Sequence, residues 1–355
     1  MMPDQVAFVI GVDTHRDSHE IAICERTGRV LATAPVAATP LGYQQALRLA
    51  ARHAPGCRMW AVEGTGSYGR GLACFLAEHA EQVVEIDRPS RRDARSAQKT
   101  DTLDAVRAAQ EAISRAHLAA PRAGGDREAL RALYTTREGA IAVRRDGLNQ
   151  LRALIVTAPE PLRHSLRALS REQLVTRCAK LHATNGGGDQ RATRLALSLI
   201  ARRVIAASRE ARLLEAEIHQ LVERLAPTLI AEHGVGPISA AQIVIAWSHP
   251  GRIRSEAAFA ALAGASPVPA SSAQITRHRL NRGGDRQLNR ALWTIARIRL
   301  QSHPATIAYT ARRRAEGKTD REIRRCLKRY LARHFYRLLT NPAPDPSALT
   351  AIEAS

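Results

Sequence analysis

The chain has 355 residues, of which 45% are hydrophobic, and a formal net charge of +20 at pH 7. This length allows two or three domains with a large core, while the lack of a signal-like or long apolar stretch argues against secretion and a membrane span. The cysteines are odd in number and lack metal-ligand spacing, so we expect reduced, buried thiols of a cytosolic protein at Cys24, Cys57, Cys74, Cys178 and Cys326.

The positive charge is confined to one part of the chain. Residues 1–120 hold 14 basic and 14 acidic side chains, whereas residues 121–355 hold 39 basic and 19 acidic ones. Almost all the basic residues are arginine, whose guanidinium group binds phosphate oxygens in pairs. We therefore expect the second part to bind nucleic acid. An arginine-rich genome would explain the choice of arginine over lysine, but not the asymmetry.

Residues 6–12 form a short, mostly apolar and β-branched run that leads directly into Asp13. This pattern predicts a buried strand with a carboxylate at its end. Open α/β folds bind their ligands at the carboxyl ends of central strands, so Asp13 is a candidate site residue. A turn-forming aspartate is the alternative explanation for this residue alone.

Further strands are predicted at residues 20–24, 30–34, 57–63 and 83–86, with helices at 40–53 and up to about residue 79. The resulting order, βββαβαβ, is that of a ribonuclease-H-like domain. The fourth strand ends in Glu63, a second strand-end carboxylate. Gly64 and Gly66 after it lack the spacing of a nucleotide-binding loop, and we interpret them as letting the backbone pass close to the carboxylate.

Two more acids, Asp101 and Asp104, open a helix predicted to run to about residue 119. Acids three positions apart share a helix face, although the same pair could form a purely structural capping box. Four acids brought together from separate elements would repel one another unless a cation neutralised them. An all-carboxylate set suits a pair of Mg²⁺ ions and phosphoryl transfer. Lys99 could contact a phosphate beside them.

Residues 121–225 are predicted to form a long-helix region. A helix at 126–158 and a joint at 182–189 precede a run of apolar residues spaced by three and four. This run comprises Leu197, Ile200, Val204, Ala207, Ala211, Leu214, Ile218, Leu221 and Leu225. Four such heptads predict a coiled coil or a long helical hairpin. Packing within one chain and self-association of an oligomer would both bury this seam.

Residues 226–341 are predicted to be mostly helical. Gly234-Val-Gly236-Pro, between two helical stretches, resembles a helix-hairpin-helix turn, whose N–H groups bind a DNA phosphate; a plain helical turn is the alternative. A loop with Ser271 and Ser272 follows, and a helix is predicted to begin near Asp285. The arginines around this loop are Arg277, Arg279, Arg282, Arg286 and Arg290.

A serine beside clustered guanidinium groups could attack a phosphodiester, because arginine holds the phosphate and neutralises developing charge. A solvated serine on a DNA-binding surface would explain the same loop. Basic helices with interleaved aromatic residues then run to residue 341, before a tail at 342–355. They fit contact with a nucleic-acid backbone.

Taken together and in order, these motifs resemble the transposases of the insertion-sequence one-ten family, relatives of the Piv DNA invertase. The resemblance spans nearly the whole chain. It is carried by Gly-Val-Asp13-Thr-His, Ala-Val-Glu63-Gly-Thr-Gly, Lys99-Thr-Asp101-Thr-Leu-Asp104-Ala, Gly-Val-Gly-Pro237 and Ala-Gly-Ala-Ser-Pro…Ser-Ser272…Asn-Arg-Gly-Gly-Asp285-Arg-Gln-Leu-Asn-Arg290.

The resemblance implies an α/β, ribonuclease-H-like (RuvC-like) domain at residues 1–120, a coiled-coil region at 121–225, and a mostly α transposase domain at 226–341. It assigns Mg²⁺ binding to Asp13, Glu63, Asp101 and Asp104, and the nucleophile to Ser272. The family usually has Ser-Gly where this chain has Ser272-Ala273, so the adjacent Ser271 remains the alternative.

The implied function is a DNA recombinase that excises and inserts its own element. The resemblance also implies a structured guide RNA that pairs with the element junction and the target DNA. A homo-oligomer, dimer or tetramer, in the nucleoid of the cytoplasm is expected. Two other functions stay open: a RuvC-like nuclease that cuts branched DNA with metal-activated water, and a non-catalytic nucleic-acid-binding protein.

Overall fold

The computed structural model describes residues 5–86, 101–115, 117–122, 124–182, 187–269, 278–279, 281 and 283–341. The chain divides into two compact units, each assembled from separated segments. Unit 1 comprises Met1–Gly125, Ala246–Asp285 and Arg329–Pro342, and unit 2 comprises Asp126–Ile245, Arg286–Lys328 and Ala343–Ser355. Among the described residues, no helix has both the length and the apolar character needed to cross a membrane.

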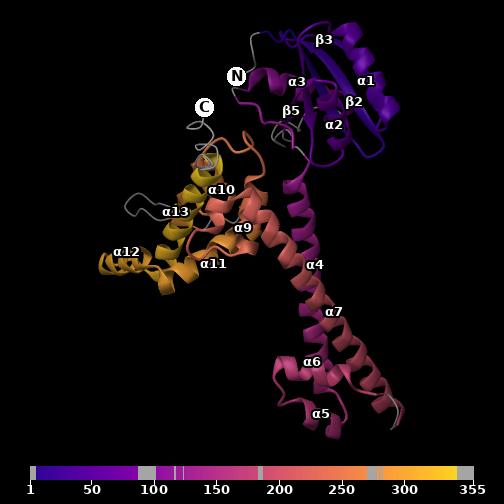
Figure 1. The fold of residues 1–355 in the computed structure, drawn as a ribbon. Coiled ribbons are helices and arrows are strands. Elements are labelled where there is room, and N and C mark those ends of the chain that lie inside the picture. The colour runs from indigo at the N-terminus through magenta and orange to yellow at the C-terminus, as the bar shows by residue number, and fades with distance from the viewer. Residues whose placement is uncertain are drawn as a thin grey trace, which may run out of the picture. The chain divides into compact units, whose positions relative to one another are not determined.

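Unit 1 contains a five-stranded sheet in the order β3-β2-β1-β4-β5 (Figure 1). Its strands are Phe8–Thr14 (β1), Ser18–Glu25 (β2), Val30–Ala37 (β3), Arg58–Glu63 (β4) and Gln82–Ile86 (β5). The first three strands form an antiparallel meander, and β4 and β5 run parallel to β1. The order of strands and helices in this mixed α/β part is the predicted one.

The two faces of the sheet pack against different helices. One face, with Ile10 and Trp60, contacts α1 (Pro40–His53) and α2 (Arg70–Glu78). The other face contacts α3 (Asp101–Ser114), which ends five residues before the predicted residue 119. Its strand residues include Val9, Cys24, Met59 and Ala61. Because side chains alternate along a strand, Asp13 and Glu63 belong to this second face, the α3 face.

Helix α3 approaches β1 very closely at Gly11. A Cβ atom at this position would lie 2.0 Å from the Ala105 carbonyl oxygen and 2.6 Å from the Ala109 backbone nitrogen. The fully buried side chains of the helix are all alanine: Ala105, Ala108, Ala109 and Ala112. Asp101 and Asp104 lie one turn before Ala105 and Ala108, so they continue the same helix face past the end of β1.

Unit 2 is built on an antiparallel pair of long helices, α4 (Asp126–Val156) and α7 (Gly188–Leu225) (Figure 1). The predicted heptad residues from Leu197 to Leu221 are buried. Arg224 near the end of α7 contacts Asp126 at the start of α4, with 3.1 Å between Nη2 and Oδ2. Two short helices that the sequence analysis did not predict, α5 (Glu160–Leu166) and α6 (Arg171–Ala179), pack at the other end of the pair.

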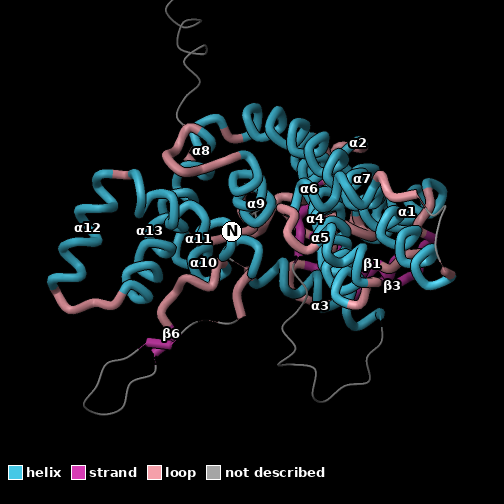
Figure 2. The backbone as a smooth tube through the Cα atoms, turned by 90° about the horizontal axis from the view of Figure 1, so that it is seen from below, coloured by secondary structure: helices cyan, strands magenta, loops and turns pink. Residues whose placement is uncertain are grey.

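The rest of the described chain is mostly helical (Figure 2). Its helices are Pro227–Ile230 (α8), Pro237–Trp247 (α9), Glu256–Leu262 (α10), Arg286–Ser302 (α11), Pro304–Ala315 (α12) and Asp320–Thr340 (α13). Val268–Pro269 (β6) pairs with His278–Arg279 (β7) in a two-stranded antiparallel ladder. The helix before the Gly234 turn, α8, is only four residues long.

The five cysteines are free. Cys24 and Cys178 are buried, and burial raises the pKa of the Cys178 thiol to about 11. Cys57 and Cys74 are exposed, so the prediction of buried thiols is wrong for these two. Cys57 lies in the turn before β4, and Cys74 lies on the outward face of α2, where no core element covers them.

The contact at Gly11 predicts a specific destabilisation. Gly11→Ala places a methyl group against the α3 backbone, which cannot rotate away, and should lower the stability of unit 1 by about 2 kcal/mol or more. Gly139→Ala is the matched control, because a Cβ there meets nothing within 4 Å. Alanine in place of a helical glycine should raise the free energy of unfolding by about 0.5–1 kcal/mol. Thermal unfolding followed by circular dichroism measures both. A Gly11→Ala chain that unfolds at the same temperature as the wild type would contradict the close packing.

Candidate functional site

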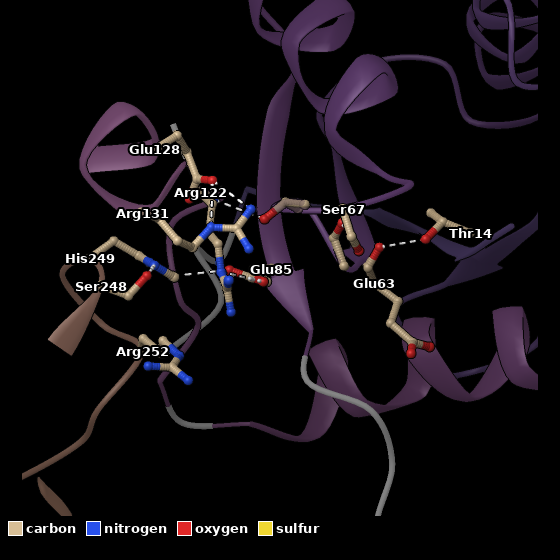
Figure 3. A network of polar contacts seen from close by, with 12 residues as sticks. Thr14, Glu63, Ser67, Glu85, Arg122, Glu128, Arg131, Ser248, His249 and Arg252 are labelled. Atoms are coloured by element: carbon tan, nitrogen blue, oxygen red, sulfur yellow. Dashed lines mark hydrogen bonds and ion pairs between the residues drawn. The ribbon is translucent and has the colours of Figure 1, made fainter. Parts of the chain in front are cut away.

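The carboxyl ends of β1 and β4 place Asp13 and Glu63 at neighbouring positions. The parallel register pairs Val12 with Val62, so the next residue of each strand is an acid. The Thr14 hydroxyl donates a hydrogen bond of 2.9 Å to the Glu63 backbone oxygen and ties the two strand ends together (Figure 3). Asp13 is buried, with 8% of its surface exposed, and Glu63 is half-buried. The sheet therefore fixes the backbone of both acids.

His15 lies between two of the predicted acids. Its Nδ1 is 3.9 Å from Asp13 Oδ2, and its Nε2 is 3.9 Å from Asp101 Oδ1. One ligand atom from each of these three residues can be chosen so that all lie within 4.8 Å of one another. Ligand atoms that share one ion at about 2.1–2.5 Å lie roughly 3–4.5 Å apart, so small movements would let the three hold a metal ion.

Asp104 has a cationic neighbour. Its Oδ1 accepts a hydrogen bond of 2.8 Å from Arg107 Nη1, one turn further along α3. The helix begins at Asp101 itself, and in the described part of the chain no side-chain hydrogen bond links Asp104 to the backbone of Asp101. Asp104 thus lies on the same helix face as Asp101, and its carboxylate is partly neutralised by a guanidinium group.

Glu20 is a fifth acid, which the sequence analysis did not single out. It pairs with Asp13 across β1 and β2, and directly opposed strand residues point to the same face. Burial raises the pKa of Glu20, and the nearby charge of Asp101 raises it further. The signal was available in the sequence, because Glu20 has the same strand parity as Cys24, which packs on the α3 face.

This donor set fits a divalent cation. Burial is the main cause of the raised pKa of Glu20, and the nearby negative charge of Asp101, which a bound cation would neutralise, adds to it. Carboxylate oxygens suit Mg²⁺, Ca²⁺ and Mn²⁺, whereas an imidazole nitrogen suits transition metals. The residues that could hold the ion are Asp13, His15 and Asp101, with Glu63 on the neighbouring strand.

A second polar group lies on the opposite face of the sheet and is built differently. His249 Nε2 is 3.1 Å from Glu85 Oε2, and Arg122 Nε is 3.4 Å from Glu85 Oε1 (Figure 3). Burial raises the pKa of Glu85, but the nearby His249 imidazole and the charge of Arg122 outweigh it, and the net pKa lies below the usual range. Figure 3 shows the Glu63 side chain directed away from this group.

The Glu85 group has a structural role. Its members come from β5, from the segment after α3 and from the turn after α9, all within unit 1. Breaking such a buried pair by removing one partner costs about 3–5 kcal/mol, because an uncompensated charge is left behind. The group therefore joins the segment Ala246–Asp285 to the sheet and adds no donor to the acidic site.

The predicted nucleic-acid-binding residues are described only in part. Outside the described residues or side chains lie Lys99, Arg277, Arg279, Arg282 and the serine pair Ser271 and Ser272 with Ala273. Gly234 has a φ of +80°, as a tight turn before α9 requires. A Cβ at Gly236 would meet nothing within 4 Å, so this turn is open on that side.

Two of the predicted arginines lie on α11. Arg286 is exposed at its first turn. Arg290 has a protein partner, since its Nη2 donates a hydrogen bond of 2.7 Å to Glu138 Oε2 on α4. Burial raises the pKa of Glu138, but its bonds with Arg290 and Arg137 outweigh burial and lower it. The structure thus uses Arg290 within unit 2, where its bond to Glu138 links α11 to α4.

The two ends of the serine-bearing loop are held together within unit 1. Val268 pairs with Arg279, and Pro269 pairs with His278. Further out, the Asp285 backbone nitrogen donates to the Leu262 carbonyl oxygen at 2.6 Å. The described residues on the two sides of the stretch that contains Ser271 and Ser272 in sequence therefore lie side by side.

Two separate parts of the chain match family models of transposases. Residues 10–158 match a family model described as transposase, of the DEDD type, and residues 227–311 match one described as transposase, IS116/IS110/IS902 family. Together the two ranges cover about two thirds of the chain. The four predicted acids fall in the first range, and Ser272 falls in the second.

The chain is also similar to the insertion element IS110 uncharacterized 43.6 kDa protein of Streptomyces coelicolor. The two are 35% identical over 123 residues, which is 34% of this chain. The match spans 30% of that relative, less than a third of its length.

Removing the charge of single acids tests the site. Asp13→Asn and Asp101→Asn keep the size of the side chain but remove one charged ligand, and each should weaken Mg²⁺ binding by at least about tenfold in calorimetric titration. Glu63→Gln and Asp104→Asn should also weaken it. Glu111→Gln is the control, because this acid lies on the same helix and pairs with Arg115 instead. An Asp104→Asn chain that binds Mg²⁺ normally and is only less stable would favour the purely structural role.

Proposed function

The chain belongs to the IS116/IS110/IS902 transposase family, and from this premise we propose that it is a DNA recombinase that excises a mobile element and inserts it elsewhere. The observation that carries the proposal is the meeting of Asp13 and Asp101 at the end of β1, within the part of the chain that matches the DEDD-type model. Acids from a strand end and a helix start converge there. Such a group is suited to phosphodiester chemistry.

The proposed architecture follows the family. A RuvC-like N-terminal domain is supported by the meander of β1–β3 followed by the parallel strands β4 and β5. The seam of α7 packs against α4, and a coiled-coil arm for self-association is the proposed use of this helix pair. The turn at Gly234, open on one side at Gly236, supports a phosphate-binding helix-hairpin-helix turn.

The proposed cofactor is Mg²⁺, held by Asp13, Glu63, Asp101 and Asp104. When bound, the cation would neutralise charge on the scissile phosphate. The chain contributes preorganisation, because Asp13 and Glu63 are fixed by the sheet and joined through Thr14, so little ordering remains when DNA binds. Arg107 beside Asp104 adds a positive charge at the same end of α3.

Ser272 is the proposed nucleophile. Its oxygen would form a bond to phosphorus while the bond from phosphorus to one deoxyribose oxygen breaks. The serine gives up its proton and the released deoxyribose oxygen takes one up, so that a phosphoserine ester and a free hydroxyl result. A hydroxyl of the new partner strand then attacks the ester, and the serine regains a proton. Ser271 is the alternative nucleophile.

The proposed partners are nucleic acids. The excess of 39 basic over 19 acidic side chains in residues 121–355 supports binding of element-junction and target DNA, together with a structured guide RNA. A homo-oligomer, dimer or tetramer, would bring the acidic group of one protomer to the serine loop of another. The proposed location is the nucleoid of the cytoplasm.

A second candidate is a RuvC-like nuclease of branched DNA. It is favoured by one observation: Asp13 and Asp101 come close enough to share a metal ion, and such an acidic group alone suffices for cleavage by water. The two candidates differ in whether the chain ever becomes covalently attached to DNA.

Ser272→Ala separates these candidates. The protein is incubated with junction DNA, the non-coding RNA of its element and Mg²⁺, then denatured and examined for DNA attached to the chain. We expect an adduct that disappears in Ser272→Ala and persists in the control Ser271→Ala. DNA cleavage should also be lost in Ser272→Ala, because a serine recombinase has no second nucleophile.

Three other outcomes are informative. An adduct lost in Ser271→Ala alone would move the nucleophile by one residue. Cleavage without any adduct would favour the nuclease. Binding of DNA or RNA without cleavage under all conditions would leave a non-catalytic nucleic-acid-binding protein.

A further inference from the structure

His15 lies at the acidic site but is not one of its four predicted acids. It follows β1 directly, and its backbone nitrogen donates a hydrogen bond of 3.0 Å to the Ser18 carbonyl oxygen in the turn to β2. This bond holds the backbone of His15 two residues after Asp13. The side chain is about half exposed, at 47%, so it can be reached from solvent. The strand and the turn that follows it therefore fix the backbone position of His15, and its side chain is short.

The distances around the imidazole fit a shared ion better than direct bonding. Both nitrogen–oxygen separations, to Asp13 and to Asp101, are 3.9 Å, which is too long for a hydrogen bond. Two ligand atoms that each lie about 2.1 Å from one ion can be separated by up to roughly 4.2 Å. These two distances involve different ring nitrogens, but one nitrogen of His15 also lies within 4.8 Å of an oxygen of both carboxylates, so small movements would let that single nitrogen share an ion with Asp13 and Asp101.

We propose that His15 is a nitrogen ligand of the ion held by Asp13 and Asp101. This inference rests on the proposed function and deepens it by naming the class of metal. One ring nitrogen binds the ion together with the two carboxylates, and the other ring nitrogen carries the proton.

A mixed nitrogen and oxygen site changes metal preference. Mg²⁺ prefers oxygen ligands and keeps several of its waters, so an imidazole adds little to its binding. First-row transition metals accept imidazole readily, and Mn²⁺ also keeps the carboxylate and water chemistry of Mg²⁺. With His15 as a ligand, the site should bind Mn²⁺ more tightly than Mg²⁺. Removing the His15 imidazole should reduce this difference in affinity.

The test uses the full chain, Mn²⁺ as the probe and a spectroscopic readout independent of activity. Pulsed electron paramagnetic resonance of bound Mn²⁺ detects a directly coordinated nitrogen. We expect this nitrogen coupling in the wild type and in His164→Ala, an exposed histidine of α5 that serves as control. The coupling should be absent in His15→Ala. In calorimetric titration, His15→Ala should weaken Mn²⁺ binding by about tenfold and Mg²⁺ binding by no more than about threefold.

Two results would overturn the proposal. The first is Mn²⁺ bound in the wild type, and displaced by Asp13→Asn, with no nitrogen coupling. The second is equal weakening of both metals in His15→Ala without loss of the coupling, which would make His15 a positioning residue for the acids. A chain that binds neither metal at Asp13 would instead contradict the metal site of the proposed function.

Discussion

The close approach of α3 to β1 at Gly11 is the constraint on which the candidate site depends. The sheet alone brings Asp13 and Glu63 together, because β1 and β4 are parallel neighbours. Asp101 reaches Asp13 only because an alanine-lined helix lies directly against a strand that has no side chain at Gly11. A larger residue on either side would move the start of α3 outward, and the carboxylates of Asp13 and Asp101 would lie further apart.

Local signals predicted the framework of unit 1 because each element carries its own pattern. Thr39 and Pro40 predicted the start of α1, and the Thr39 hydroxyl does accept a hydrogen bond from the Gly42 backbone nitrogen. The strands consist either of alternating apolar and polar residues or of continuous apolar runs, as buried strands do. The same patterns locate Asp13 at a strand end and Asp101 at a helix start, although they do not give the distance between them.

Other features depend on tertiary contacts that no local pattern encodes. His15 and Glu20 join the acidic group through a tight turn and through strand register, and both were missed. Glu85 was not singled out within the predicted strand at residues 83–86, yet it is buried against His249, more than 160 residues away in sequence. Composition predicted a basic half, but not that Arg290 is used to pair with Glu138. Net charge indicates the class of partner; the contacts decide which arginines remain to bind it.

The central claim is that the ends of β1 and β4 and the start of α3 form one metal centre. Anomalous diffraction from a crystal of the full chain soaked in Mn²⁺ tests it most directly, because the signal locates the ion without reference to activity. The account predicts an anomalous peak within bonding distance of the Asp13 and Asp101 carboxylates, on the α3 face of the sheet. Mn²⁺ bound elsewhere on the chain, with no peak between these two carboxylates, would contradict it.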